Sequence, residues 1–381
     1  MKISLQPILL SWARQRAGFS VGVLAKKMGV KPEKVTAWEQ DGKLTFKQAE
    51  KLAKFTHTPF GYLYLYEPPE DSMPVTDFRT LNSEEITQPS PNLLATLDQA
   101  QQIQSWLRHE LVFQGHEPLD FVGSLSQEVP VLTAAEHISR TIRFNVASEA
   151  SNWENAFTLQ VEQIENAGVL VMRNGVVGNN THRALSIDEF RGFALSDEYA
   201  PLIFINGKDA KAAQMFTLVH ELVHIWVGVS GVSNLDNTYT RQNNIEQFCN
   251  QVAAELLVPA DELQYQWSEQ LPQDNWLHYL TRYFKVSSLV ILRRLKDTQL
   301  MSNDEFQNYY SQEVARFQAV RNRNGGDFYK TQLARVSRQF VSALVESTLE
   351  GRTPYREALR LLNISKVETF HKIAEQLTVS V

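Results

Sequence analysis

Residues 220–224, with the sequence His-Glu-Leu-Val-His, constrain this chain more than any other feature. They lie within the apolar run 216–227, which predicts a buried helix. Residues four apart on a helix lie on one face about one turn apart, so His220 and His224 can reach a single metal ion. Glu221 lies beside them, where it can take a proton from a water bound to that metal. The alternative is that both histidines are ordinary core residues whose ring nitrogens bond backbone carbonyls. This alternative is disfavoured, because burying two histidines and a glutamate in so apolar a helix without a partner costs free energy.

A catalytic zinc ion needs a third protein ligand and an open position for water. The only histidines after residue 224 are His278 and His371, which lie far along the chain in unrelated settings. Nearby acidic residues are therefore the candidates, and we favour Glu246. Its spacing from His224 allows a loop and a return helix over residues 246–257 that packs on the first helix.

Two other residues of the return helix bear on this site. Asn250 lies one turn after Glu246 on the same face, where it can orient a ligand histidine. Glu255 is the competing third ligand, although nine positions place it about half a turn round the helix from Glu246. We therefore predict Glu246 as the third ligand and keep Glu255 as the alternative.

Composition narrows the class of protein. The chain of 381 residues is long enough for two or three domains, and its 43 % hydrophobic and 21 % charged residues are typical of globular proteins. No apolar stretch approaches the roughly 20 residues that span a bilayer, and the N-terminus has no signal-peptide pattern. The single cysteine, Cys249, excludes an intrachain disulfide and fits a reducing cytosol. We expect a cytoplasmic protein without membrane contact.

The N-terminal segment differs in charge from the rest. Residues 1–70 carry 11 Lys and Arg against 6 Asp and Glu, whereas the remaining residues carry 26 against 37. Residues 5–66 also predict five short helices, with Ser20 as an N-cap, Gly29 in a turn and Pro32 at the start of the next helix. Two short helices joined this way are typical of a DNA-binding helix-turn-helix. The side chains expected at DNA are Ser20, Lys31, Lys34 and Thr36.

Beyond residue 90 the pattern predicts a multidomain fold, mainly α with a small β-sheet. Helices are expected over 92–115 and 153–167, and strands over 168–172 and 201–206. The helix that carries His220 and His224, called the metal helix below, is expected to begin near Ala210. After residue 245 the chain is expected to be helical. The expected division is a helix-turn-helix domain at 1–67, a linker at 68–90, a metallopeptidase domain at 91–300 and a helical C-terminal region at 301–381.

The order of these motifs resembles the ImmA/IrrE-like metallopeptidases that carry an N-terminal Xre/Cro-type helix-turn-helix. The matching segments are 77–80, 190–193, 201–206, 216–224, 246–250 and 253–259. The resemblance covers roughly residues 1–300 and implies a zincin-like α+β core. It also implies Zn²⁺ on His220, His224 and Glu246, with Glu221 as the base. The chain departs from the family at Cys249 and Val252, where Ala and Phe are usual, and at Asp41 and Leu44, where Gly and Pro are common.

Three functions follow as hypotheses. The first is a zinc endopeptidase that cuts a protein substrate. The resemblance implies that this substrate is a repressor or antitoxin in a stress, phage or toxin–antitoxin context, and a neighbouring gene is the candidate that encodes it. The second is a DNA-binding transcriptional regulator or antitoxin with a structural or sensory zinc site. The third reads the N-terminal unit as a protein-docking module.

Tyr239, His182 and Arg241 are the candidate oxyanion donors, and a homodimer is a candidate oligomeric state. Residues 279–295 also resemble a small helix-turn-helix, which in this family packs on the catalytic lobe. The basic residues after 315 are expected to lie on a solvated helix surface.

Overall fold

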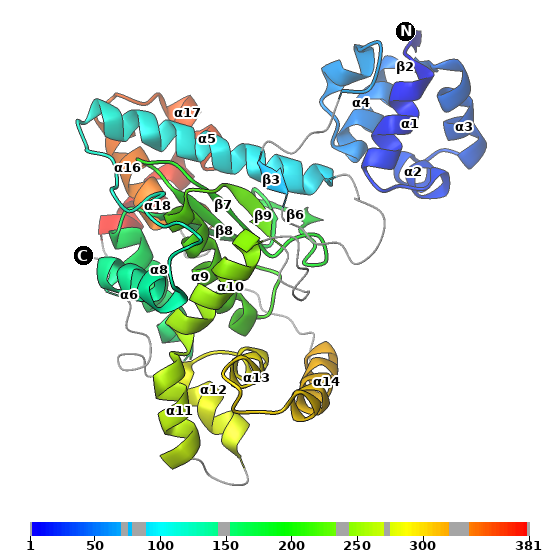
Figure 1. Cartoon of the computed structure of the whole chain (residues 1–381). Helices are drawn as coiled ribbons and strands as arrows, with labels where there is room; N and C mark the ends of the chain where they lie inside the picture. The colour runs from blue at the N-terminus through cyan, green and yellow to red at the C-terminus, as the bar shows by residue number, and fades with distance from the viewer. Residues whose placement is uncertain are drawn as a thin grey trace. The chain divides into compact units, whose positions relative to one another are not determined.

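A computed structural model describes residues 2–69, 75–77, 89–143, 153–233, 244–269, 275–319 and 335–378 (Figure 1). The chain divides into two compact units, one of residues 1–74 with 83–98 and one of residues 75–82 with 99–381. Each unit is described by itself below. No helix in the described ranges combines the length and apolar character needed to cross a membrane.

The first unit contains the five predicted short helices. They are α1 (Pro7–Arg16), α2 (Val21–Met28), α3 (Pro32–Asp41), α4 (Phe46–Thr56) and the 3₁₀ helix η1 (Phe60–Tyr64). The Ser20 hydroxyl caps α2 by accepting a 3.2 Å hydrogen bond from the Val23 backbone N–H, and Pro32 opens α3, as predicted. Val35 and Trp38 of α3 are buried in the unit's core. The unit also contains a two-stranded antiparallel sheet that was not predicted, β1 (Lys2–Ser4) with β2 (Lys43–Thr45).

The second unit is built on a five-stranded sheet in the order β3-β9-β7-β8-β4. Its strands are β3 (Thr76–Asp77), β4 (Leu170–Asn174), β7 (Gly192–Leu195), β8 (Leu202–Asn206) and β9 (Gly231–Ser233). β4 runs parallel to β8 and β3 parallel to β9, whereas β7 is antiparallel to both of its neighbours. A separate hairpin is formed by β5 (Val176–Val177) and β6 (Asn180–Ala184). The strands expected over 168–172 and 201–206 are confirmed, but β3 lies inside the segment expected to be a linker.

Helices cover this sheet. The metal helix α9 (Lys211–Val227) begins after Ala210, as predicted, and packs on β7, β8 and α10 (Asn244–Leu257). α10 also packs on α6 (Val131–Ile142), and α8 (Trp153–Asn166) leads into β4. The C-terminal end of α9 receives backbone donors from elsewhere in the chain. Gly123 N–H donates to the Ile225 carbonyl at 3.1 Å, and Leu125 N–H donates to the Trp226 carbonyl at 2.9 Å.

The described residues after 245 are helical, as predicted. The remaining helices are α5 (Pro91–Phe113), α11 (Ala260–Glu269), α12 (Trp276–Phe284), α13 (Ser288–Asp297), α14 (Asn303–Ala319), α16 (Arg338–Leu349), α17 (Tyr355–Leu361) and α18 (Val367–Thr378). α12 and α13, the segment resembling a second helix-turn-helix, share one hydrophobic core with α9, as that resemblance implied. α16 packs on α5 through an edge-to-face contact between the rings of Phe340 and Trp106, whose centroids are 5.5 Å apart.

Candidate metal centre

The metal helix places its two histidines on one buried face. His220 and His224 lie one turn apart in α9, and both have an exposed fraction of 0 %. Their Nε2 atoms are 3.1 Å apart. This closeness follows from the four-residue spacing, which stacks side chains on one face of a helix.

Glu246 completes a group of three. It lies in the first turn of α10, and the packing of α10 on α9 brings its carboxylate to both imidazoles. Its Oε2 atom is 3.2 Å from His220 Nε2, and its Oε1 atom is 3.0 Å from His224 Nε2. The ligand atoms of all three side chains lie within 4.8 Å of one another. The expected convergence of His220, His224 and Glu246 is therefore present.

The donor set fits a divalent metal ion of the zinc type. Two imidazole nitrogens and one carboxylate form a common protein ligand set of catalytic zinc, with a further position open. Both Nε2 atoms face the same carboxylate at a depth where unpaired polar atoms are costly. The Nδ1 atom of His220 is buried and has no hydrogen-bond partner among the described residues. These observations favour a cation shared by the three side chains over a set of ordinary core contacts.

Glu221 lies next to this group and is also fully buried. Burial raises the pKa of its carboxyl well above the ordinary value, and the nearby charge of Glu246 raises it further. The Ser233 hydroxyl of β9 opposes this rise, although it makes no hydrogen bond of standard geometry with the carboxylate. A buried carboxylate with a raised pKa is a strong proton acceptor whenever it is ionised.

The pKa values of Glu246 and His224 are shifted downward, unlike that of Glu221. Burial alone would raise the pKa of Glu246, but the charges and hydrogen bonds of His220 and His224 outweigh it, so this pKa lies far below the usual range. Burial lowers the pKa of His224, and the charge of His220 adds to this effect, whereas Glu246 opposes it. An ionised carboxylate and a neutral imidazole are the forms that bind a metal ion.

The other predicted residues of the metal site are placed as follows. Asn250 lies one turn after Glu246 in α10, where it is half-buried. Glu255, the competing ligand, instead accepts hydrogen bonds from the Arg294 guanidinium and from the Ala260 backbone N–H. These contacts place the Glu255 carboxylate where α10 meets α13.

Of the three oxyanion candidates, only one is in the described part of the chain. His182 lies on the exposed hairpin strand β6. Tyr239 and Arg241 fall outside the described residues. Ser233 and Gly192, which pair with each other across β9 and β7 beside Glu221, were not predicted as residues of the site. Gly192 lies in segment 190–193, which carries the family resemblance, but its residue type indicates no chemistry, and the long-range strand pairing is what brings both residues to the helix.

The residues expected at DNA lie on the first unit. Lys31, Lys34 and Thr36 are exposed at the start and outer side of α3. Thr36 also donates a 3.3 Å hydrogen bond from its hydroxyl to the Pro32 carbonyl. Ser20 uses its side-chain oxygen to cap α2. The position of α3 is fixed by a bidentate ion pair between Arg14 of α1 and Glu39, with N–O distances of 2.6 and 3.0 Å.

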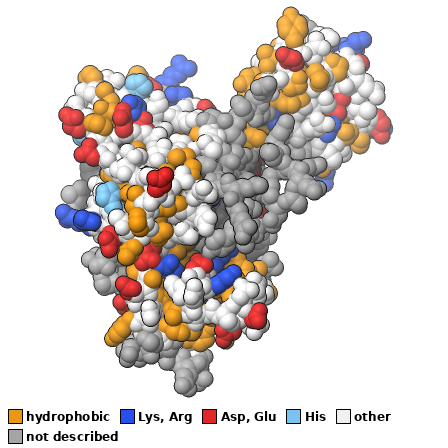
Figure 2. Space-filling view, in the orientation of Figure 1, with side chains coloured by type: hydrophobic (Ala, Val, Ile, Leu, Met, Phe, Trp, Pro, Cys, Tyr) orange, Lys and Arg blue, Asp and Glu red, His pale blue; other side chains and the backbone are white. Residues whose placement is uncertain are grey.

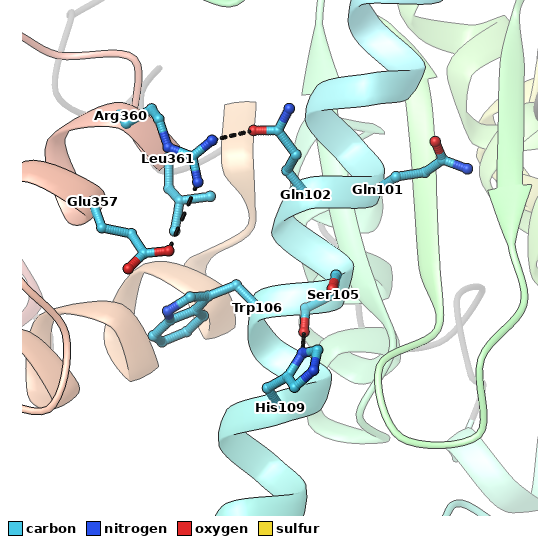
Figure 3. A pocket seen from close by; sticks show the side chains of 8 residues that line it. All are labelled: Gln101, Gln102, Ser105, Trp106, His109, Glu357, Arg360 and Leu361. Carbon is cyan, nitrogen blue, oxygen red and sulfur yellow. Dashed lines mark hydrogen bonds and ion pairs between the residues drawn. The ribbon is translucent and has the colours of Figure 1, made fainter.

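A cavity of about 500 Å³ lies between α5 and α17 (Figure 3). Trp106 and Leu361 give it apolar walls, and Arg360 donates a 2.9 Å hydrogen bond to the side-chain oxygen of Gln102. The His109 ring bonds the carbonyl of Ser105, one turn before it on α5. None of the metal-centre residues lines this cavity, so it is a feature of the contact between α5 and the C-terminal helices.

Comparisons with known families agree with the chemistry of the metal centre. Residues 164–296 match the family model of the IrrE N-terminal-like domain, a peptidase family designated Peptidase M78. The match contains β4 to β9 and both helices of the metal centre. Residues 336–376, which contain most of α16 to α18, match a domain of unknown function (DUF8813). No curated protein matches the chain. The segment around the centre is thus similar to the IrrE N-terminal-like domain of a peptidase family.

Proposed function

We propose that this chain is a zinc-dependent endopeptidase in which His220, His224 and Glu246 hold the metal and Glu221 is the catalytic base. The observation that carries the proposal is the convergence of His220, His224 and Glu246, whose facing atoms are 3.0–3.2 Å apart, with the fully buried carboxylate of Glu221 beside them. A purely structural metal site has no use for a base next to its ligands. The match to a peptidase family over residues 164–296 supports the same reading.

The chain's own residues would share the work in the following way. When bound, zinc supplies Lewis acidity toward the carbonyl of the scissile peptide bond and acidifies a water molecule. The Glu221 carboxylate accepts the proton of that water and then passes it to the nitrogen of the leaving amine. Glu246, held ionised by the two histidines, keeps the ligand set negatively charged. Asn250 is proposed to orient a ligand histidine once the metal is bound.

The first unit is proposed to bind DNA and to direct the peptidase to a protein of the repressor or antitoxin type. Support comes from the excess of basic residues in this segment and from the exposed Lys31 and Lys34 on α3. A neighbouring gene is the first place to look for the substrate.

The Glu221→Gln substitution tests the peptidase proposal. Gln keeps the shape of the side chain but cannot accept the proton, so the variant should bind one equivalent of zinc and cleave the neighbouring gene's product about 10²–10⁴-fold more slowly. Co-expression followed by mass spectrometry of the product measures cleavage, and elemental analysis measures zinc. Cleavage at the wild-type rate would end the peptidase proposal.

A second candidate function is regulation through binding alone, with zinc in a structural or sensory role. Exposed hydrophobic side chains gather on the first unit (Figure 2), and they favour a protein-docking version of this alternative. They are Ile8, Val23, Phe46, Tyr62, Tyr64, Leu65 and Tyr66. Under this alternative Glu221→Gln leaves regulation in cells unchanged, whereas His220→Ala abolishes it.

A further inference from the structure

Gly192 opens β7 directly above the base. A β-carbon added to this glycine would lie 2.6 Å from Thr217 Cγ2, 2.9 Å from Glu221 Oε1 and 3.0 Å from the Phe204 carbonyl oxygen. The first two distances are shorter than any ordinary carbon contact allows. The backbone of Gly192 has no positive φ, so an alanine here meets no backbone strain. Space is the only reason for a glycine at this position.

The atoms around Gly192 differ in their freedom to move. The Phe204 carbonyl belongs to β8, whose register with β7 is fixed by the pairing of Phe193 with Phe204. Thr217 is buried, and its hydroxyl donates a 3.1 Å hydrogen bond to the Ala213 carbonyl, which restrains its methyl group. The Glu221 carboxylate has no hydrogen bond of standard geometry to hold it. A side chain at residue 192 would therefore displace the carboxylate of Glu221.

We propose that Gly192 is a positioning residue, whose missing side chain leaves the space in which the Glu221 carboxylate lies beside the metal ligands. The proposal rests on the proposed function for its catalytic meaning, because it assigns Glu221 the role of base. The steric relation between the two residues, however, is measurable without any substrate. Thr217 and Glu221 lie four residues apart on α9, so both face β7 and both meet the added atom.

A double-mutant cycle on the zinc-loaded, full-length protein tests this relation. Gly192→Ala should lower the Tm by several degrees and keep one equivalent of zinc, because none of the atoms it displaces belongs to a ligand. In the Glu221→Ala background the carboxylate is gone, so the same substitution should lower the Tm by less. An equal fall in the two backgrounds would overturn the proposal.

Thr217→Ser separates positioning of the base from plain packing of the helix on the sheet. Serine lacks the methyl group that lies nearest to the added β-carbon, so it should also reduce the cost of Gly192→Ala in part. If Thr217→Ser reduces the fall in Tm caused by Gly192→Ala but Glu221→Ala does not, the glycine serves only the packing of the helix on the sheet. That result would refute the proposal. Gly175→Ala is the matched control, because the atom nearest to its added β-carbon is Cγ of the exposed Lys208 side chain at 3.0 Å, which can move, while the Lys208 backbone nitrogen lies at 3.3 Å.

Proteolysis gives a second readout once a substrate is known. Gly192→Ala should lower kcat with little change in KM, because the base is displaced while the zinc ligands stay in place. If the peptidase proposal fails, Glu221→Gln has no effect on cleavage, and the thermal cycle still decides whether Gly192 positions Glu221. A KM effect alone, with kcat unchanged, would contradict the positioning role.

Discussion

Two carboxylates share the buried centre, and their surroundings push their pKa values in opposite directions. Burial and the charge of Glu246 raise the pKa of Glu221. The two histidines lower the pKa of Glu246, against the effect of its own burial. Divergent pKa values in neighbouring groups are typical of sites where one group binds and the other transfers protons. The residue that ionises easily, Glu246, is the proposed ligand, and the residue that holds its proton strongly, Glu221, is the proposed base.

The ligand assignment predicts a contrast between two glutamates of the same helix. Glu246→Gln removes a charged ligand and should weaken zinc binding by more than the roughly 10–100-fold typical of losing an outer partner of a metal site. Glu255→Gln keeps a side-chain oxygen for the Ala260 N–H and should leave zinc affinity unchanged. Competition with a chromophoric chelator measures both variants. An equal loss of zinc affinity in the two variants would contradict this assignment and favour Glu255 as a ligand.

At the scale of elements, strong local signals were sufficient for prediction. The apolar run 216–227 predicted α9, and Ser20 with Pro32 predicted the starts of α2 and α3. The short strands β3 and β9 were missed, because two or three residues show no alternation and their partners lie far along the chain. The ligands could be predicted from spacing, but Gly192 and Ser233 could not, because only the β7–β9 pairing brings them to Glu221.

One contact between distant elements predicts a pH dependence. Glu165, at the end of α8, accepts hydrogen bonds from the Ser337 hydroxyl and the Arg338 backbone N–H at the start of α16. Burial raises its pKa above the ordinary value of 4.5, against the effect of these two donors. A carboxyl with a higher pKa in the folded state contributes stability below the unfolded pKa and loses it as the pH rises through the folded pKa.

Glu165→Gln removes this titration, so its Tm should rise relative to wild type as the pH increases from about 4 toward neutral. At the acidic end both side chains are neutral, and the two proteins should differ least. Glu368→Gln, on an exposed position of α18, is the control and should follow wild type at every pH. Differential scanning calorimetry across the range measures the effect. A Tm difference that is constant with pH would contradict it.

At the scale of the whole molecule, basic residues are concentrated in the first 70 residues and acidic residues in the rest. A polyanion is attracted to the first segment and repelled by the remainder, which favours contact through α3 and its surroundings. The proposed DNA contact therefore predicts a strong dependence on salt, because each neutralised phosphate releases counterions.

The double variant Lys31→Ala with Lys34→Ala should lower the slope of log affinity against log salt by about 2, since each lysine contributes roughly one phosphate contact. Fluorescence anisotropy with a duplex from the promoter of the protein's own gene measures this slope for the full chain. Lys366→Ala, at an exposed lysine just before α18, should leave the slope unchanged. An affinity that does not respond to salt would rule out the phosphate contacts.

The order of strands in the central sheet sets when the metal centre can form during synthesis. β9 pairs with β3, which was made more than 150 residues earlier, and the end of α10 is held by Arg294, which is made later still. All of these segments must have left the ribosome before the β3–β9 pairing and the Arg294 contact can form. A nascent chain therefore carries His220, His224 and Glu246 before it carries all of the contacts that surround them in the folded unit.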